Sequence, residues 1–438
     1  MKNFAYKITG GEPIKGTIGC LGAKNFATKA MVAALLTHDK SVLTNVPDIG
    51  DIDLTLEMLK AIGVKIDYDK KKNRVVIDPS GISTYKVPNP DSGSNRIPIL
   101  LLSPLLHRFG KAEVPVLGGC NIGKRNVDFH IEAIRKFGGI IECDNNGYTA
   151  FTKKGLTATQ ITLPYPSVGA TETCLYLSVL ARGTTIINNI ALEPEIMALI
   201  TMLRSMGAII FTTPSRTIKI EGVSKLQGTK TKILGDRIEG ASWACLACAS
   251  KGDIAVEGIV PETLGNFLSY YQKIGGGFEI MGEEKMRFFQ KTKLVATNIE
   301  TDVYPGFSTD WQQPFAILLT QAEGVSNMHE TVYEQRFGYL AALNKLGANT
   351  KLSTDCLGEN CRFEKQGFKH SATIIGPTPL RANGILEIPD LRAGLAYLIA
   401  AAIAEGTTTL TGIEMIERGY GNLPNRLNNI LEIEKIEI

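Results

Sequence analysis

The sequence predicts an α/β protein of two domains, and two observations support this prediction. A unit of helix, strand, helix and further strands recurs six times along the 438 residues. A chain of this length is sufficient for two or more domains of about 150 residues each. Hydrophobic residues make up 44% of the chain and charged residues 21%, as in an ordinary globular protein with a packed core. We therefore expect three units in each domain.

Each of the six units opens with small apolar residues at helical spacing, breaks at a turn and continues as a strand. Because these openings carry few charges, we expect them to form a buried helical layer. They comprise residues 29–45, 97–118, 171–189, 241–258, 312–329 and 393–412.

A second, amphipathic helix follows each opening, and strand pairs such as residues 74–77 and 217–220 come next. In five units this helix ends at an apolar residue followed by glycine, which is a helix stop signal. The sixth unit is shorter and lacks this glycine. Since one unit cannot bury both of its helices, several units must pack together. The five stop signals are Ile62-Gly63, Phe137-Gly138, Met206-Gly207, Ile274-Gly275 and Leu346-Gly347.

The boundary between the domains is expected near residues 235–237, between the third and fourth units. We expect the N-terminal strand, residues 4–8, to return to the second domain, so that the chain crosses between the domains twice. The predicted domains are residues 23–234 and residues 1–22 with 235–438. Such an arrangement is suited to closure around a substrate.

Composition excludes several classes of protein. The net charge is only +3, and no run of five basic residues occurs, which argues against nucleic acid as a partner. The eight cysteines are scattered along a long chain, as in a reducing cytosol rather than a disulfide scaffold. The first residues lack the apolar core of a signal peptide, and no apolar run could span a membrane. We therefore expect a cytoplasmic protein that binds neither nucleic acid nor membrane.

The pattern of residues 114–130 predicts a short apolar strand, a glycine-rich loop and the start of a helix. The loop carries Cys120, and Lys124 and Arg125 follow within five residues. Positive charge and a helix N-terminus both favour a thiolate. The segment predicts a reactive cysteine, and the alternative is an unreactive cysteine that merely fits in the loop.

Other cysteines and histidines are given structural interpretations. The CxxC pair Cys245 and Cys248 lies within an apolar, alanine-rich helix, which indicates core packing. Cys356 and Cys361 share a loop, but a zinc site would need two more ligands, so we interpret their proximity as chance. His130 is expected to be a hydrogen-bonded structural histidine. We predict no metal and no cofactor.

Six cations stand beside glycines or at junctions of the repeats. If they converge on one cleft, they suit a substrate with several phosphates and a carboxylate, because guanidinium groups bind such anions bidentately. Residues 167–171 open a buried helix and form a natural anion cradle, while Asp310 and Asp390 can accept a proton. The pattern indicates an enzyme for polyanionic small molecules. The six cations are Lys24, Arg96, Arg125, Arg336, Arg392 and Arg418.

These residues stand in motifs that match a known family from end to end. The chain resembles the UDP-N-acetylglucosamine 1-carboxyvinyltransferases, enolpyruvyl transferases that begin peptidoglycan precursor synthesis. The local sequence around its motifs is similar to that of the chlamydial branch. The motifs are residues 22–25, 118–125, 167–171, 307–310, 330–336, 390–392 and 418–420.

The resemblance implies a fold and a reaction. The fold is the two-domain inside-out α/β barrel of enolpyruvyl transferases, with six βαβαββ units, three per domain. The reaction moves the enolpyruvyl group of phosphoenolpyruvate to the 3′-hydroxyl of UDP-N-acetylglucosamine and releases phosphate through a tetrahedral ketal intermediate. These two small molecules are the expected partners, and no obligate protein partner is predicted.

The resemblance also implies site residues. Cys120 matches the family cysteine, which is the target of fosfomycin. Two roles for Cys120 remain open: it donates a proton, or it chiefly governs closure and product release. Asp310 is the candidate base for the sugar hydroxyl. Catalysis further involves Lys24, Arg125, Asp390 and Arg418. The residues expected to bind phosphoenolpyruvate are Lys24, Asn25, Arg125, Arg336, Arg392 and Arg418. The residues expected to bind the UDP-sugar are Asn25, Arg96, Arg125, Asn126, Val127, Asp128, Phe129, Tyr165, Pro166, Ser167, Val168, Asp310 and Val332.

The sequence departs from the family pattern at Asn126, where many members have proline, and at Tyr165-Pro166. Chlamydial members often carry aspartate at the position of Cys120. Two alternatives remain open. One is a sister enzyme that uses shikimate 3-phosphate as acceptor, and the other is a paralogue that binds the UDP-sugar without turnover. RNA cyclases share the repeat architecture, but the low net charge argues against RNA.

Overall fold

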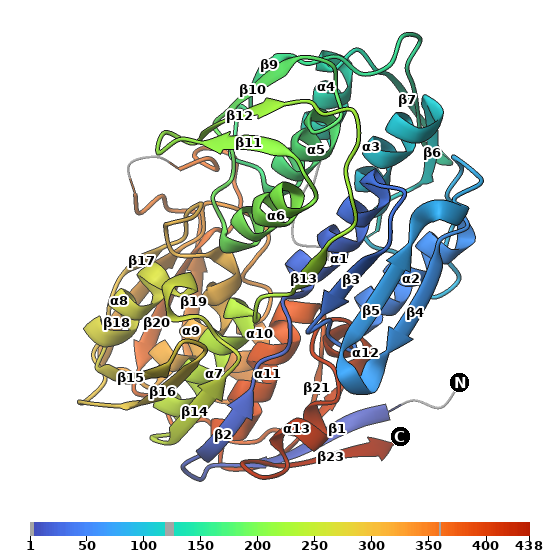
Figure 1. The fold of residues 1–438 in the computed structure, drawn as a ribbon. Helices are drawn as coiled ribbons and strands as arrows, with labels where there is room; N and C mark the ends of the chain where they lie inside the picture. The colour runs from blue at the N-terminus through green and yellow to red at the C-terminus, as the bar shows by residue number, and fades with distance from the viewer. Residues whose placement is uncertain (1–3, 119–126, 359–360) are drawn as a thin grey trace. The chain divides into compact units, whose positions relative to one another are not determined.

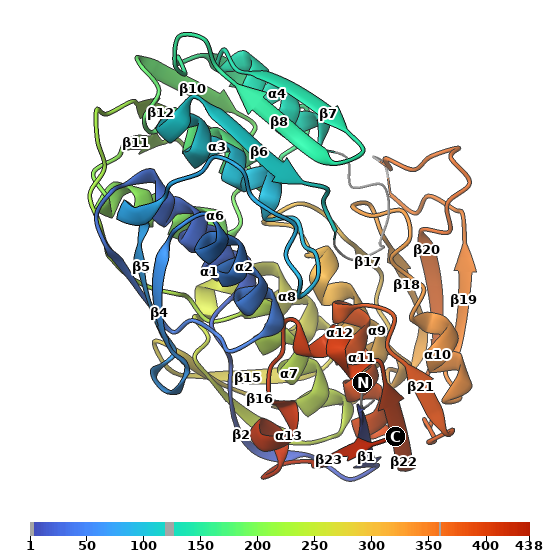
Figure 2. The same cartoon turned by 90° about the vertical axis from the view of Figure 1, so that its right-hand side faces the viewer.

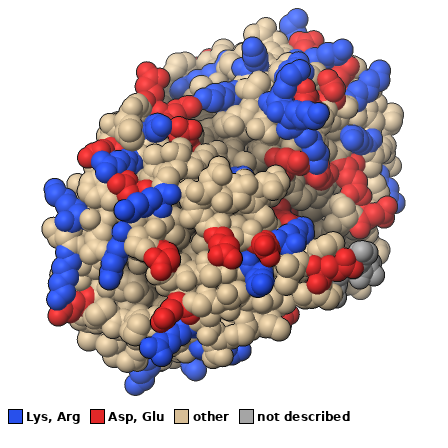
Figure 3. Space-filling view, turned by 90° about the horizontal axis from the view of Figure 1, so that it is seen from below, with Lys and Arg blue, Asp and Glu red and all other residues tan. Residues whose placement is uncertain are grey.

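The computed structural model describes residues 4–118, 127–358 and 361–438, which form two compact units (Figure 1). The N-terminal unit comprises residues 22–118 and 127–234, and the C-terminal unit comprises the described residues of 4–21 and 235–438. In the described chain, no helix has the length and apolar character needed to cross a membrane. On the face shown in Figure 3, basic and acidic side chains are interspersed, in keeping with the small net charge.

The N-terminal unit contains three buried helices, three amphipathic helices and three sheets. The buried helices are α1 (Lys24–Ala33), α3 (Pro98–Phe109) and α5 (Val168–Ser178), and α3 contacts both of the others. The amphipathic helices are α2 (Gly50–Ala61), α4 (Asp128–Lys136) and α6 (Pro194–Ser205). In sheet order, the strands are β13 (Lys230–Lys232), β3 (Ser41–Thr44), β5 (Arg74–Asp78) and β4 (Lys65–Asp69); β6 (Lys111–Pro115), β8 (Gly147–Phe151) and β7 (Ile140–Asp144); and β11 (Ile209–Thr212), β12 (Thr217–Glu221), β10 (Thr184–Asn188) and β9 (Gln160–Thr162).

The C-terminal unit repeats this plan. Its buried helices α7 (Arg237–Ala249), α9 (Gln312–Thr320) and α11 (Leu391–Ile403) contact one another. The other helices are α8 (Gly265–Lys273), α10 (Leu340–Lys345), α12 (Ile413–Glu417) and α13 (Leu423–Leu427). In sheet order, the strands are β15 (Gly276–Gly282), β16 (Lys285–Gln290), β14 (Asp253–Glu257) and β2 (Lys15–Gly19); β17 (Ile299–Glu300), β18 (Gly324–His329), β20 (Ser371–Gly376) and β19 (Asn349–Ser353); and β21 (Ile385–Glu387), β22 (Gly406–Thr411), β1 (Phe4–Gly10) and β23 (Glu432–Glu437). Short 3-10 helices are η1 (Ala34–Leu36), η2 (Lys70–Lys72), η3 (Pro79–Gly81), η4 (Pro261–Thr263) and η5 (Thr309–Trp311).

The sheets share one topology, which makes the sequence repeat visible in three dimensions. In each four-stranded sheet, the strand that follows a buried helix pairs in parallel with one neighbour and antiparallel with the other. In the last sheet, β1 lies between β22 and β23 and pairs antiparallel with both. The N-terminal strand thus supplies the pairing strand that the short sixth repeat lacks.

Local signals in the sequence predict the helix ends and the core correctly. The five predicted stop glycines have φ values between +86° and +108°, a region that residues with a side chain rarely adopt. Every residue of α7 is buried, including Cys245 and Cys248, so the interpretation of this CxxC pair as core is confirmed.

Candidate active site

Polar residues gather where the buried helices of the C-terminal unit begin. Asp236 caps α7 by accepting hydrogen bonds from the backbone N–H groups of Ile238 and Glu239, at 2.9 and 3.3 Å. Asp390 caps α11, and Asp310 lies in η5 directly before α9. A helix N-terminus carries partial positive charge and unpaired N–H groups, so this end of the helices favours anions.

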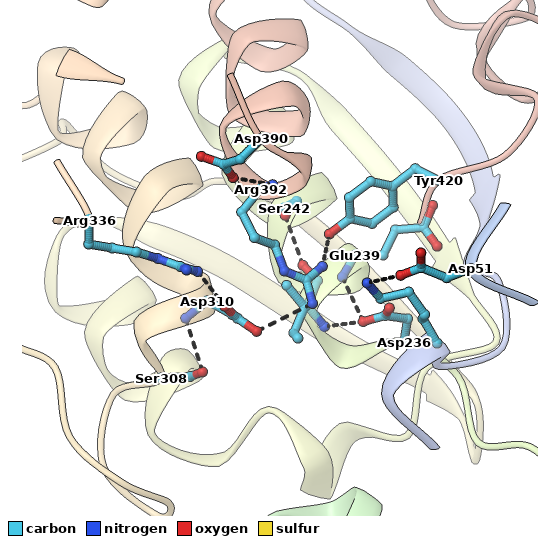
Figure 4. Close-up of polar contacts among 12 residues, drawn as sticks. Asp51, Asp236, Glu239, Ser242, Ser308, Asp310, Arg336, Asp390, Arg392 and Tyr420 are labelled. Atoms are coloured by element: carbon cyan, nitrogen blue, oxygen red, sulfur yellow. Dashed lines mark hydrogen bonds and ion pairs between the residues drawn. The ribbon is translucent and has the colours of Figure 1, made fainter. Parts of the chain in front are cut away.

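The carboxylate of Asp310 lies between two arginines, one from the connection between β18 and α10 and one from α11 (Figure 4). Arg336 donates a hydrogen bond to Oδ1, and Arg392 Nη2 lies 3.3 Å from Oδ2. The backbone N–H of Asp310 donates to Ser308 Oγ at 3.3 Å, which fixes the turn that carries the carboxylate. One acid and two guanidinium groups, distant in sequence, thus form a single cluster.

Both arginines of this cluster are buried, with 4% of Arg336 and 8% of Arg392 exposed. Burial alone lowers the pKa of Arg336, but the carboxylates of Asp310 and Glu330 raise it above its ordinary value. Burial likewise lowers the pKa of Arg392. Tyr420 and Asp310 raise this pKa by more than burial lowers it, so the net shift is upward. Both groups therefore stay charged. Arg336 Nε is buried and has no hydrogen-bond acceptor among the described residues.

Glu330 is fully buried and holds the chain segment that leads to Arg336. Its carboxylate accepts four hydrogen bonds, from Thr309 Oγ1 at 2.8 Å, Gln312 Nε2 at 2.7 Å, and the backbone N–H groups of Val332 and Tyr333 at 2.8 and 3.0 Å. Burial raises the pKa of Glu330, and Arg336 and these donors oppose the shift. The carboxylate is thus a positioning group for the segment that contains Val332 and Arg336.

The motif at residues 418–420 packs against the start of α11. The hydroxyl of Tyr420 accepts a hydrogen bond from Arg392 Nη1. A side chain at Gly419 would meet the Leu391 methyl groups at 2.8 and 2.9 Å, so the two motifs touch without room for a larger residue. Arg418 follows α12 in the same segment and is partly exposed.

In the N-terminal unit, Lys24 and Asn25 are the first residues of α1. Lys24 Nζ lies 2.8 Å from Asp51 Oδ2, at the start of α2, and both side chains are largely buried. Farther along the helix, burial lowers the pKa of Lys29 and the carboxylate of Glu172 opposes this shift. Burial raises the pKa of Glu172 itself. The predicted cation Lys24 therefore belongs to a group of buried charges in this unit.

A second group in the N-terminal unit surrounds His130. His130 Nδ1 lies 2.7 Å from Thr173 Oγ1, and the ring packs over Gly169, where an added Cβ would lie 3.0 Å from the imidazole. Burial, followed by the charge of Arg96, lowers the pKa of His130 to about 3. His130 is thus a neutral, hydrogen-bonded residue at working pH, as predicted, and it connects the elements that carry Arg96 and residues 167–171.

The predicted UDP-sugar residues of this unit lie at the beginnings of α4 and α5. Val127 is the N-cap residue of α4, and Asp128 and Phe129 form its first turn. Ser167 caps α5 and accepts a hydrogen bond from the Ala170 N–H at 3.4 Å, while Tyr165, Pro166 and Val168 beside it are partly exposed. The predicted anion cradle is therefore a capped helix N-terminus.

The segment that leads to Cys120 is anchored at its start. The Gly118 N–H donates to the Asn95 carbonyl at 3.0 Å, and a side chain at Gly118 would meet Ser94 Oγ at 1.9 Å. This contact fixes Gly118 beside the turn that carries Arg96. The predicted residues Cys120, Arg125 and Asn126 lie outside the described residues.

The structure thus divides the described site residues between the two units. Lys24, Asn25, Arg96, residues 127–129 and residues 165–168 belong to the N-terminal unit, and the others belong to the C-terminal unit. Sequence reasoning assigned no role to Asp51, Asp236, Glu330 or Tyr420, although Glu330 and Tyr420 stand within the quoted motifs. For Asp51, only its place in the first turn of a helix was visible in the sequence.

The prediction that Cys356 and Cys361 are neighbours by chance, with no metal site, depended on the lack of two further ligands. The structure supplies them, because His329 and His370 lie beside both cysteines. The premise of this interpretation, that two further ligands are missing, is therefore wrong.

Two units of repeated sheets and buried helices, each with charged groups at helix N-termini, define the enolpyruvyl transferase class. A family model described as EPSP synthase (3-phosphoshikimate 1-carboxyvinyltransferase) matches residues 8–427, so the chain belongs to this family.

Within the family, the chain is similar to curated proteins named UDP-N-acetylglucosamine 1-carboxyvinyltransferase. The one from Protochlamydia amoebophila is 45% identical over 97% of this chain and 92% of its own length. The one from Chlamydia muridarum is also 45% identical, over 95% of this chain and 96% of its own length. UDP-N-acetylglucosamine 1-carboxyvinyltransferase 2 from Geobacillus kaustophilus is 35% identical, over 97% and 94%. The predicted resemblance, including its chlamydial character, is confirmed.

Solved structures agree on the fold. The enolpyruvyl transferase NikO from Streptomyces tendae superimposes with a TM-score of 0.88 at 23% identity, and each chain is covered completely. EPSP synthase from Acinetobacter baumannii gives a TM-score of 0.72 at 18% identity, again with complete coverage of both chains. The predicted enolpyruvyl transferase fold is confirmed.

Proposed function

We propose that this protein transfers the enolpyruvyl group of phosphoenolpyruvate to the 3′-hydroxyl of UDP-N-acetylglucosamine and releases phosphate. The observation that carries the proposal is the cluster of Asp310, Arg336 and Arg392, which sets one carboxylate among buried cations at helix N-termini. The names of relatives that align over nearly the whole chain support this acceptor rather than shikimate 3-phosphate. We place the reaction in the cytoplasm, where it starts peptidoglycan precursor synthesis.

Charge neutralisation is the main task of the site, because phosphoenolpyruvate carries a phosphate and a carboxylate. Guanidinium groups bind such anions in a fixed, bidentate geometry. We propose that Arg336, Arg392 and Arg418 of the C-terminal unit, with Lys24 and Arg125, bind phosphoenolpyruvate. Fixed cations stabilise the charge that develops in the transition state without the cost of reorienting water.

The proposed reaction is an addition followed by an elimination. Asp310 takes the proton of the sugar hydroxyl as its oxygen bonds to C2 of phosphoenolpyruvate, and Cys120 donates a proton to the methylene carbon. The ketal then loses phosphate and a methyl proton, which restores the double bond. The arginines balance the negative charge in both steps, while Asn25, Arg96, Val332 and the segments at 125–129 and 165–168 bind the UDP-sugar.

Phosphate release in the presence of phosphoenolpyruvate and either acceptor tests the proposal. We expect release with UDP-N-acetylglucosamine and only background release with shikimate 3-phosphate. Release with shikimate 3-phosphate alone would establish the sister activity. If the UDP-sugar binds, as measured by calorimetry, but no phosphate appears with either acceptor, the protein is a binding paralogue.

The role proposed for Cys120 is tested with Cys120→Asp and Cys120→Ser. Aspartate still carries a transferable proton, so we expect it to retain more turnover than serine. Intact-mass measurement should also show one fosfomycin adduct on the wild-type chain when the UDP-sugar is present, and none on Cys120→Asp. Equal loss of turnover in both variants would assign Cys120 to closure or product release.

A further inference from the structure

We propose that the C-terminal unit contains a structural zinc site made by His329, Cys356, Cys361 and His370. Each residue offers one ligand atom, and the four atoms all lie within 4.8 Å of one another. Two cysteines and two histidines are a donor set that zinc prefers. This inference is independent of the proposed transferase activity.

The distances between the donor atoms fit a tetrahedral ion. Cys361 Sγ lies 3.3 Å from His329 Nε2 and 3.2 Å from His370 Nε2, and Cys356 Sγ lies 3.5 Å from His370 Nε2. Around a tetrahedral zinc with bonds of about 2.3 Å to sulfur and 2.0 Å to nitrogen, such atoms stand about 3.5 Å apart. These three donor pairs therefore already have the spacing of ligands that share one ion.

The second ring nitrogen of each histidine has a partner that sets the tautomer. His329 Nδ1 lies 2.7 Å from Glu300 Oε2, and His370 Nδ1 lies 2.8 Å from the Phe368 carbonyl. Because both of these partners are acceptors, the neutral form of each ring carries its proton on Nδ1 and presents a lone pair at Nε2. A histidine that donates its other N–H to a carboxylate or carbonyl is the usual arrangement around a bound metal.

The strands that carry these residues are neighbours in one sheet, β17-β18-β20-β19 (Figure 2). Glu300 on β17 is opposite His329 at the end of β18, and His329 is opposite Ser371, next to His370, at the start of β20. Strand pairing alone thus aligns the two histidines and the carboxylate.

The two cysteines come from an extended connection, residues 354–370, between β19 and β20. The corresponding connections in four other repeats are much shorter, namely residues 70–73, 145–146, 213–216 and 283–284. The described residues of this connection form no helix or strand, and a connection of this length generally serves a function. Here that function is the delivery of two sulfur ligands to the end of the sheet.

The protein packs closely around the group. Both histidines are 1% exposed, and the Phe363 ring lies 5.7 Å from that of His370. The Phe363 N–H donates to Cys361 Sγ at 3.4 Å, which fixes the position of the sulfur atom. A side chain at Gly358 would collide with Glu300, at 1.7 Å from Oε2, so the loop lies directly on the residue that orients His329.

All four coordination positions are filled by protein, which indicates a structural rather than a catalytic ion. The ion would attach residues 354–370 to the ends of β18 and β20. His329 directly precedes Glu330, the residue that positions the segment leading to Arg336. Zinc would therefore hold the base of a segment that carries substrate-binding residues.

The test measures metal content in full-length protein purified without a histidine tag from zinc-supplemented cells. We expect about one zinc per chain by mass spectrometry. Replacement by Co²⁺ should give the thiolate-to-cobalt charge-transfer absorption and intense visible bands of a tetrahedral site. Cys361→Ser should lose the zinc and this spectrum, whereas the matched control Cys143→Ser, at an exposed cysteine, should retain both.

A milder variant keeps the test decisive if Cys361→Ser does not fold. Glu300→Ala leaves all four ligands in place, and we expect its affinity for zinc to fall by about tenfold in a chelator competition. The proposal is overturned if wild-type protein contains no zinc and takes up no Co²⁺, if Cys361→Ser keeps its zinc, or if intact mass shows a Cys356–Cys361 disulfide in protein prepared without oxygen.

Discussion

Replacement of Asp310 by asparagine is the most informative perturbation of the C-terminal site. The substitution preserves the shape of the side chain but removes the negative charge between Arg336 and Arg392. An asparagine oxygen can still accept from one arginine, but its NH₂ group then faces the donors of the other. Residue 310 would then offer the two buried guanidinium groups one acceptor oxygen instead of two.

The magnitude follows from burial. Removing one partner of a fully buried ion pair costs about 3–5 kcal/mol. Arg336 and Arg392 are buried, but 23% of the Asp310 side chain is exposed. Since asparagine also keeps one hydrogen bond, we expect Asp310→Asn to lose about 2–3 kcal/mol of unfolding free energy. If Asp310 is the base, turnover should fall by about 10²–10⁴-fold as well.

Two measurements on the same protein separate these effects. Urea unfolding without ligands gives the loss of stability, and phosphate release at saturating substrates gives the loss of turnover. Asp302→Asn is the matched control, because Asp302 is an exposed carboxylate a few residues upstream and should leave both values unchanged. If Asp310→Asn unfolds at the wild-type midpoint and keeps turnover within about threefold, the reasoning from buried charge and general-base catalysis fails.

Three further outcomes are expected. Tyr420→Phe removes the acceptor of a buried Arg392 donor, so it should lower unfolding free energy by about 1–3 kcal/mol and raise the KM for phosphoenolpyruvate in the phosphate assay. Because the pKa of His130 is lowered to about 3, only the unfolded chain gains a proton as pH falls below about 6.5. His130 should therefore contribute a loss of about 1.4 kcal/mol per pH unit below that value. Because burial also lowers the pKa of His107, to about 4, urea titrations of His130→Asn should show the acid slope reduced by this amount. Gly118→Ala forces a methyl group onto Ser94, so kcat should fall when it is measured at saturating substrates.

Each of these variants has a control that would expose a false interpretation. Gly282→Ala places a methyl group where no atom lies within 4 Å, and equal losses in both glycine variants would rule out the steric argument. His38→Asn alters an exposed histidine, so it should keep the acid slope. A Tyr420→Phe protein with wild-type stability and KM would show that its hydroxyl does not support Arg392.

The fold could be predicted largely because its signals are local. Apolar runs at helical spacing and the glycines that end helices lie within single units, and the structure has left-handed backbone at all five predicted glycines. The completion of the sixth unit depends instead on pairing between β1 and β22, which are separated by nearly the whole chain. Repetition made the missing strand noticeable, but only the structure gives its register.

Recognisable motifs were enough to single out Arg336 and Arg392, which the structure brings together around Asp310, and their role in binding stays a prediction. The site was not predictable where a residue acts through partners distant in sequence. His329 and His370 carry no spacing signal with Cys356 and Cys361, because strand pairing rather than sequence separation brings them together. The four-donor environment of Glu330 is likewise a product of tertiary packing.

Asp390 shows how the structure changes the meaning of a predicted catalytic residue. Its Oδ1 accepts the backbone N–H groups of Arg392 and Ala393 at 2.9 and 3.1 Å, so it caps the helix turn that presents Arg392. Asparagine caps helices about as well as aspartate, whereas alanine costs about 1 kcal/mol. We therefore expect Asp390→Asn to retain most of the wild-type kcat/KM and Asp390→Ala to lose more, mainly through the KM for phosphoenolpyruvate. A proton acceptor would behave differently, because asparagine cannot take up a proton and would be as inactive as alanine.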